Sequence, residues 1–194
     1  FEVPRGELTM LLGRNGAGRT TTLKAILGLT GKRTGSSQIE GVETIHMPTN
    51  KIARRGLGYC PEERGIFSTL SCEENLLLPP RIGAGGMSLE EIYDMFPNLK
   101  ERRNSPGTRL SGGEQQMLAL ARVLRSGAKI LLLDEITEGL APVIVHTHQR
   151  VILALNATGF TIILLQHHFH LPSPLPAPHL VFWPRPHFTR LHQQ

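Results

Sequence analysis

Residues 13–20 have the composition of a loop that binds phosphate. The sequence there is Gly-Arg-Asn-Gly-Ala-Gly-Arg-Thr, which matches the pattern G-x-x-x-x-G-K-[ST] except that Arg19 replaces the lysine. Glycines allow backbone N–H groups to converge on an anion, and a following helix adds its positive N-terminal end. We therefore predict that this segment binds the phosphates of a nucleotide. The candidate binding residues are Gly13, Arg14, Asn15, Gly16, Ala17, Gly18, Arg19, Thr20 and Thr21.

Arg19 and Thr20 would contact different parts of that ligand. A cation at position 19 meets the β- and γ-phosphates, and the Thr20 hydroxyl can ligate Mg²⁺. Arginine keeps the positive charge of lysine, but it replaces a compact ammonium with a longer, planar group. We therefore expect phosphate binding to survive better than the placement of the γ-phosphate. The alternative is a glycine-rich turn between a strand and a helix that binds no ligand.

Two carboxylates end an apolar run at residues 130–133. This run predicts a strand buried on both faces, and Asp134 and Glu135 follow it directly. Ligands of parallel sheets collect at the carboxyl ends of the strands, so the pair stands where a ligand would bind. The alternative is that the two acids only cap a loop.

Other segments predict the elements that position these residues. Apolar runs at 8–12 and 160–165 predict two more strands, and a helix is expected after Thr20. Buried strands that alternate with helices imply a parallel α/β sheet. Residues 71–128 instead carry helical signals, which are two capping boxes, at Ser71 and Ser88, and an apolar helix face at 114–124.

Composition excludes several classes of protein. The chain has 194 residues, of which 40% are apolar and 19% are charged, as in an ordinary globular domain. No apolar run approaches the roughly 18 residues that a membrane-spanning helix needs, so we expect no direct membrane insertion. The net charge is +5, yet no basic stripe interleaved with aromatic residues accompanies it. We therefore expect no nucleic-acid partner.

A second glycine-rich segment makes the resemblance to a known family specific. Residues 110–116, Leu-Ser-Gly-Gly-Glu-Gln-Gln, open the helix that runs to residue 124. In isolation, Ser-Gly-Gly could be a helix cap with a flexible lead-in. Between a phosphate loop and Ile-Leu-Leu-Leu-Asp-Glu, the segment resembles the signature of ABC transporter ATP-binding subunits. The resemblance covers residues 1–165 and implies a P-loop NTPase domain with a helical subdomain inserted at about 66–128.

The resemblance implies ATP and Mg²⁺ as ligands and gives each motif a role. Asp134 would hold Mg²⁺ through water, with Thr20 and Glu62 completing the metal site. Glu135 would polarise the attacking water, and His167 would contact the γ-phosphate. The alternatives for His167 are a coincidental histidine of the C-terminal residues and a metal cluster with His168 and His170. The signature would face the nucleotide of a second subunit in a head-to-tail dimer. Its residues are Leu110, Ser111, Gly112, Gly113 and Glu114.

Three segments are similar to one branch of the family, the importers of branched-chain amino acids. They are residues 61–67, 110–119 and 134–142. The similarity implies a cytoplasmic subunit at the inner face of the cell membrane, docked beneath membrane-spanning permease subunits. Two alternatives are kept: a soluble ABC-type ATPase of DNA repair or translation, and a nucleotide-binding remnant with impaired hydrolysis.

Both ends of the chain depart from the family pattern. Residues 166–194 hold six of the nine histidines and six of the fourteen prolines. Because proline is excluded from helix interiors and central strands, we predict an irregular tail there. We interpret this tail as the product of a shifted reading frame or an unrelated fusion. The chain begins at Phe1, so we expect that a first strand, with the aromatic residue that stacks on adenine, is lacking.

Overall fold

A six-stranded sheet forms the centre of the computed structural model, which describes residues 1–13, 16–166, 179–183 and 190–191. The strand order is β4-β5-β6-β1-β7-β8. All neighbours are parallel except β8, which runs antiparallel to β7. The predicted α/β class with a mostly parallel sheet is thus confirmed. The strands are β1 (Leu8–Gly13), β4 (Leu57–Cys60), β5 (Ile130–Asp134), β6 (Thr161–Leu165), β7 (His179–Trp183) and β8 (Arg190–Leu191).

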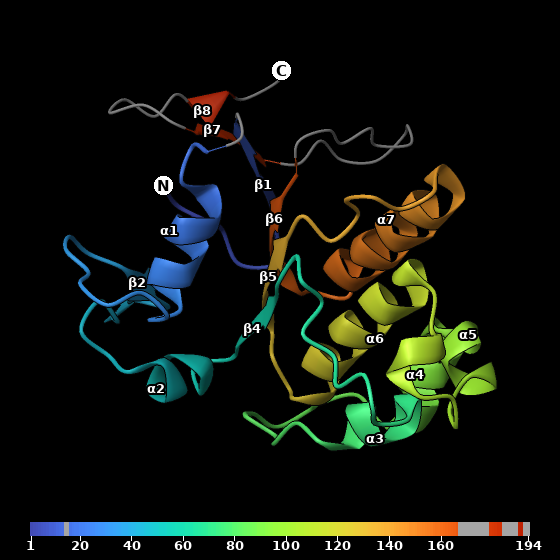
Figure 1. Ribbon diagram of the computed structural model, residues 1–194. Helices are drawn as coiled ribbons and strands as arrows, with labels where there is room; N and C mark the ends of the chain where they lie inside the picture. The colour runs from blue at the N-terminus through green and yellow to red at the C-terminus, as the bar shows by residue number, and fades with distance from the viewer. Residues whose placement is uncertain (14–15, 167–178, 184–189, 192–194) are drawn as a thin grey trace.

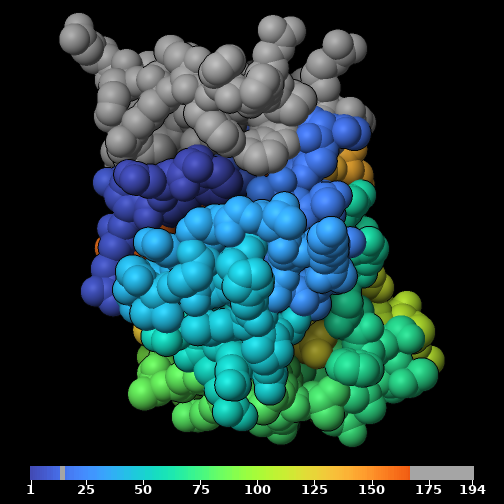
Figure 2. Space-filling view, turned by 90° about the vertical axis from the view of Figure 1, so that its left-hand side faces the viewer, coloured from blue at the N-terminus to red at the C-terminus, as the bar shows by residue number. Residues whose placement is uncertain are grey.

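One side of the sheet carries the helix that follows the phosphate loop (Figure 1). This helix is α1 (Arg19–Ile26), and α2 (Thr49–Ala53) lies on the same side. Between them in sequence, β2 (Gln38–Ile39) and β3 (Val42–Glu43) pair as a small antiparallel sheet. In Figure 2, which views this side, the segments from α1 to α2 cover the centre of the molecule in blue and cyan.

The other side carries the longest helices, α6 (Gly112–Arg125) and α7 (Pro142–Ala157). The short helices α3 (Cys72–Leu77), α4 (Leu89–Met95) and α5 (Pro97–Glu101) precede α6 and lie beside it. A single 3₁₀ turn at Gly107–Arg109 leads into α6. All of these elements except α7 occupy the sequence between β4 and β5, and α7 lies between β5 and β6.

The predicted capping boxes begin two of the short helices. Ser71 accepts a hydrogen bond from the N–H of Glu74, and the Glu74 side chain accepts one from the N–H of Ser71. Ser88 and Glu91 form the same reciprocal pair at the start of α4. Each box satisfies two N–H groups that the helix itself leaves without an acceptor.

The central strands are buried on both faces, as their apolar runs predicted. Leu131 and Leu133 of β5 pack into the hydrophobic cluster on the side of α6 and α7, whereas Leu132 packs with Leu23 of α1. Successive side chains of a strand point to opposite faces of a sheet, so Leu132 faces one helix layer while Leu131 and Leu133 face the other. A continuous apolar run satisfies both layers at once.

The prediction that no central strand forms beyond residue 165 is wrong. β7 pairs in parallel with β1 over five residues, from Thr9 opposite His179 to Gly13 opposite Trp183. Pro178 and Pro184 lie just outside this strand, so every residue of β7 can donate its N–H. The proline-rich composition of the segment concealed a short run without proline.

Within the described residues, none of the helices is both long enough and apolar enough to cross a membrane.

Candidate nucleotide-binding and catalytic site

Parallel strand ends bring the predicted motifs to one edge of the sheet. β1 ends at Gly13, where the phosphate loop begins, and β5 ends at Asp134. β6 pairs with both of these strands and is followed by Gln166. Because the three strands are parallel, the loop, the acid pair and Gln166 meet where ligands of such sheets bind.

The described part of the phosphate loop has the backbone that anion binding requires. Gly16 and Gly18 have φ angles of 75° and 85°, in the left-handed region that favours glycine. Gly18 is the N-cap of α1, and among the described residues no side chain caps this helix end. Helix N-termini carry N–H donors that no helical carbonyl accepts, so this end of α1 can bind an anion. Arg14 and Asn15 lie outside the described residues.

Asp134 receives a hydrogen bond on each of its carboxylate oxygens. The Thr20 hydroxyl of α1 donates to Oδ1 at 3.1 Å, and the Tyr59 hydroxyl of β4 donates to Oδ2 at 3.0 Å. Asp134 is 1% exposed. A hydroxyl and a carboxylate oxygen are the ligands that Mg²⁺ prefers, so Thr20 and Asp134 fit a magnesium site.

Burial and hydrogen bonding act in opposite directions on the Asp134 carboxylate. Burial raises its pKa above the ordinary value of an aspartate, while the bonds from Tyr59 and Thr20 lower it. Burial and the charge of Asp134 in turn raise the pKa of Tyr59, so this hydroxyl keeps its proton and remains a donor. Glu63 adds its negative charge to the surroundings of both groups.

Arg19 and Glu135 form an ion pair across the same edge of the sheet. The Arg19 guanidinium donates to Oε1 of Glu135 at 3.2 Å and to the backbone carbonyl of Gln166 at 3.2 Å. The two side chains are only 4% and 13% exposed. Removing one partner of a buried pair leaves an uncompensated charge, which makes such pairs costly to break singly. The arginine at position 19 therefore ties the phosphate loop to the strand ends of β5 and β6.

The backbone of Glu135 has an unusual conformation. Its φ angle is 48°, in a region that non-glycine residues adopt only at a cost. Its N–H donates to the carbonyl of Leu165 at 3.0 Å, which extends the pairing of β5 with β6 by one bond. The buried side chain of Ile136 follows at 1% exposure. The turn thus holds the Glu135 carboxylate over the strand ends.

The signature forms the N-terminus of α6. Ser111 is its N-cap and forms a capping box with Glu114, in which the Ser111 hydroxyl accepts at 3.3 Å and Glu114 Oε2 accepts at 2.7 Å. Gly113 is required by packing, because a Cβ there would lie 2.5 Å from the Ile144 side chain of α7. Arg64 donates to Oε1 of Gln115 at 2.7 Å, which connects the turn after β4 to this helix. Leu110 is buried beside them.

The structure brings together some of the predicted residues and not others. Arg19, Thr20, Asp134 and Glu135 are joined by the contacts above. The signature is apart from them, since α1 and α6 cover opposite sides of the sheet (Figure 1). Glu62 is exposed, two residues after the end of β4, and His167 lies outside the described residues.

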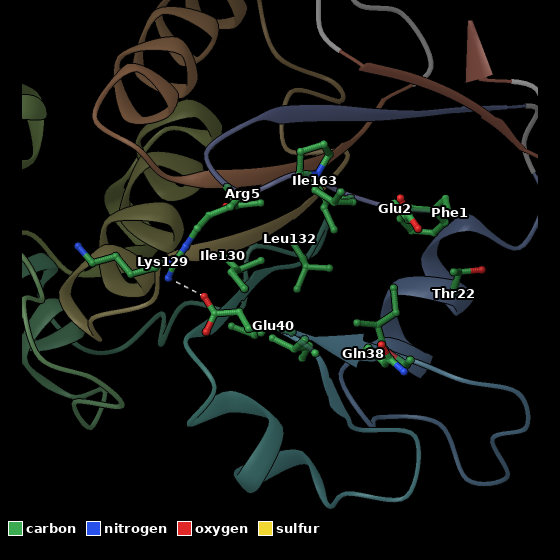
Figure 3. Close-up of a pocket in the computed structure, with 18 of the residues that line it drawn as sticks. Phe1, Glu2, Arg5, Thr22, Gln38, Glu40, Lys129, Ile130, Leu132 and Ile163 are labelled. Atoms are coloured by element: carbon green, nitrogen blue, oxygen red, sulfur yellow. Dashed lines mark hydrogen bonds and ion pairs between the residues drawn. The ribbon is translucent and has the colours of Figure 1, made fainter.

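A large cavity lies away from this edge of the sheet. It has a volume of about 1270 Å³ and lies against the sheet face near α1 and β2, with the Arg5–Glu40 ion pair crossing it (Figure 3). Leu132 and Ile163 line it from the middle of their strands, and Lys129 lines it from before β5. The phosphate loop and the acid pair do not line it, so we assign the chemistry by the polar contacts and not by cavity size.

Sequence reasoning missed three contributors to the site. Tyr59 and Gln166 reach it because β4 and β6 flank β5 in the sheet, and Arg64 reaches α6 across the fold. Tyr59 lies on β4, and only the order of the strands in the sheet places it near Asp134. No local pattern marks the other two.

Comparisons with known proteins agree with this arrangement. The profile of the family described as "ABC transporter" matches residues 1–138. The chain is 38% identical over 174 residues to the high-affinity branched-chain amino acid transport ATP-binding protein BraG of Pseudomonas aeruginosa, spanning 85% of this chain and 72% of that protein. It is 36% identical over 171 residues to the lipopolysaccharide export system ATP-binding protein LptB of Escherichia coli K12, spanning 85% and 70%.

A solved structure has the same fold. A dimeric post-hydrolysis state of the ATP-binding cassette MJ0796, bound to ADP and Pi, superposes with a TM-score of 0.80 at 22% identity, over 100% of this chain and 89% of that one. Phosphate loop, acid pair and signature thus occur together on this fold, in a chain that the family profile matches over most of its length. The chain therefore belongs to the ATP-binding subunits of ABC transporters, which are ATPases.

Proposed function

We propose that this chain is the ATP-hydrolysing subunit of an importer of branched-chain amino acids. The observation that carries the ATPase part is the contact set at the sheet edge, where Thr20 bonds to Asp134 and Arg19 pairs with Glu135. The substrate class rests on the 38% identity to BraG, against 36% to LptB. The proposed partners are membrane-spanning permease subunits, which would hold the chain at the cytoplasmic face of the membrane.

Each group at the sheet edge has a proposed role. Residues 13–21 wrap the phosphates of ATP with their N–H groups, and Arg19 adds a positive charge. Thr20 and Asp134, with Glu62, hold Mg²⁺, which neutralises the charge that develops on the phosphates. Glu135 accepts a hydrogen bond from the attacking water and orients it.

The ion pair between Arg19 and Glu135 implies that ATP binds before Glu135 orients the attacking water. While Arg19 donates to Glu135, this carboxylate is partly neutralised and orients water poorly. Phosphate oxygens compete with the carboxylate for the guanidinium, because both accept its N–H groups. ATP binding therefore releases Glu135 for its role as the water-orienting base.

The second nucleotide contact would come from another copy of the chain. The N-terminus of α6, with Ser111, offers N–H donors and a hydroxyl, but it lies on the far side of the sheet from α1. A head-to-tail dimer would place it against the phosphates held by the partner's loop. His167 would contact the γ-phosphate in the same site.

Turnover and binding of ATP test the catalytic part of this proposal. We expect Glu135→Gln to bind ATP but to lower turnover by at least about 100-fold, as removal of a general base does. The control is Glu138→Gln, an exposed carboxylate on the same loop, which should turn over like the wild type. Wild-type binding without turnover that Arg19→Lys restores would contradict the proposal and identify Arg19 as an inactivating replacement.

Complementation tests the substrate class. We expect the chain to restore leucine uptake in Pseudomonas aeruginosa lacking BraG, and not to restore growth of Escherichia coli depleted of LptB. The reverse pattern would assign the chain to lipopolysaccharide export.

A further inference from the structure

The side chain of Tyr59 contacts the acid pair although no motif includes this residue. It lies on β4, which pairs with β5 so that Tyr59 is opposite Leu132 and Cys60 is opposite Leu133. Asp134 is the next residue of β5. The Tyr59 side chain packs in the cluster on the α1 side of the sheet, and its hydroxyl donates to Oδ2 of Asp134 at 3.0 Å.

The two hydrogen bonds on Asp134 differ in what a bound metal ion would do to them. Thr20 donates to Oδ1, and both Thr20 and Asp134 are proposed metal ligands, so an ion would take the place of this bond. Tyr59 donates to the other oxygen, Oδ2, and its own oxygen is committed to the carboxylate. The Tyr59 bond can therefore persist when the metal ion is bound.

The carboxylate of an aspartate at a strand end can rotate about the side-chain torsions unless a hydrogen-bond partner fixes its orientation. Tyr59 is half-buried and packed against the cluster on the α1 side, so its hydroxyl can fix the plane of the Asp134 carboxylate. Hydrogen bonds to a charged acceptor are roughly twice as strong as neutral ones. Partners that orient metal ligands in this way commonly change metal affinity by 10- to 100-fold when they are removed.

We propose that Tyr59 is a positioning residue that holds Oδ2 of Asp134, so that Oδ1 faces the metal ion of a Mg²⁺–nucleotide complex. This inference rests on the proposed nucleotide site and adds to it a residue from the edge strand. Tyr59 also lies two residues before Pro61, so β4 connects the turn that follows it to the proposed metal site.

The chain offers a matched control for removing this hydroxyl. Its only other tyrosine is Tyr93 of α4, whose hydroxyl also donates to a carboxylate, Oε2 of Glu73, at 2.7 Å. Tyr93→Phe therefore deletes the same kind of bond away from the sheet edge.

The first test measures Mn²⁺ binding to the ADP-bound protein by electron paramagnetic resonance, and ADP binding in EDTA by calorimetry. We expect Tyr59→Phe to weaken Mn²⁺ binding by about 10-fold and to leave metal-free ADP binding unchanged, while Tyr93→Phe changes neither. Equal Mn²⁺ affinity of Tyr59→Phe and the wild type would overturn the positioning role of Tyr59 but not the proposed function. Absence of ADP binding by the wild type would overturn the proposed function as well.

The second test keeps the wild-type residue at position 59, so it does not depend on whether a Tyr59 variant folds. With ¹³C at the Cζ atom of tyrosine, the wild type gives two resonances, and Tyr93→Phe assigns them. We expect addition of Mg²⁺ to the ADP complex to shift the Tyr59 resonance and not that of Tyr93, because the acceptor carboxylate of Tyr59 changes its ligands. Two unmoved resonances, at magnesium concentrations that saturate the site, would contradict the proposal.

Discussion

At the scale of single residues, the site is a set of buried charges that satisfy one another before any ligand arrives. Arg19 replaces the lysine of the phosphate-loop pattern, and its guanidinium reaches Glu135 and the Gln166 carbonyl. Asp134 accepts from two hydroxyls. The sequence predicted Asp134 and Glu135 as neighbours of the loop, because both follow a buried parallel strand. It could not predict the pairing of Glu135 with Arg19, which depends on side-chain geometry across three strand ends.

Replacing Arg19 with lysine tests how the guanidinium affects ATP turnover. We expect Arg19→Lys to raise ATP turnover, since a lysine ammonium makes a single compact contact with the phosphates and holds Glu135 less firmly. Kinetics at saturating ATP measure this effect as a rise in kcat. A fall in kcat below that of the wild type would show that the guanidinium is the better group at this position.

A buried histidine makes stability depend on pH. His148 of α7 is 1% exposed, its Nδ1 lies 2.9 Å from the Ile144 carbonyl, and within the described residues its Nε2 has no partner. Burial lowers the pKa of His148 below its ordinary value of 6.5. The unfolded chain therefore binds a proton more readily, and the free energy of unfolding falls as the pH drops through about 6.5.

Urea unfolding at pH 7.5 and pH 5.5 checks this dependence. We expect the free energy of unfolding of His148→Leu to differ less between the two pH values than that of the wild type. At pH 5.5 the variant should be more stable than the wild type. The control is His146→Gln, which replaces an exposed histidine of the same helix and should keep the wild-type difference. An unchanged difference in His148→Leu would mean that other groups cause the acid sensitivity.

At the scale of elements, local patterns predicted what local interactions determine. The capping boxes at Ser71 and Ser88, and the strand ending at Asp134, appear where their sequences place them. β7 was missed because its place depends on β1, far away in the sequence, while the prolines around it dominate the composition. Tyr59 was missed for the same reason, since only the pairing of β4 with β5 brings it to Asp134.

The capping boxes at Ser88 and Ser111 allow an effect on stability to be distinguished from an effect on ATP-dependent dimerisation. Ser88→Ala and Ser111→Ala each remove a capping box, so each should lower the free energy of unfolding by about 1 kcal/mol. Only Ser111→Ala should also weaken the ATP-dependent dimer, because its helix end is proposed to meet the partner's nucleotide. Sedimentation velocity of each variant in the Glu135→Gln background, with ATP, measures the dimer. Equal dimer affinities in the two variants would remove the proposed role of Ser111.

At the scale of the whole molecule, the parallel sheet explains why distant segments act together. Its carboxyl edge collects the phosphate loop, the acid pair and the turn after β4, whereas the signature lies on the side of α6. In the proposed site, one copy of this chain therefore contacts the nucleotide from one direction only. We therefore propose that a second copy of the chain completes this site.

Calorimetry with two glycine variants tests directly whether residues 13–20 bind the phosphates of ATP through the backbone. Gly16 and Gly35 both have positive φ, of 75° and 102°, and open space where a Cβ would lie, so alanine strains the backbone without a clash at both positions. We predict that the wild type binds ATP and that Gly16→Ala weakens binding by at least about 10-fold, a loss of about 1.4 kcal/mol. Gly35→Ala should bind like the wild type. No heat of binding by the wild type at millimolar ATP, or equal affinities of Gly16→Ala and Gly35→Ala, would contradict the account.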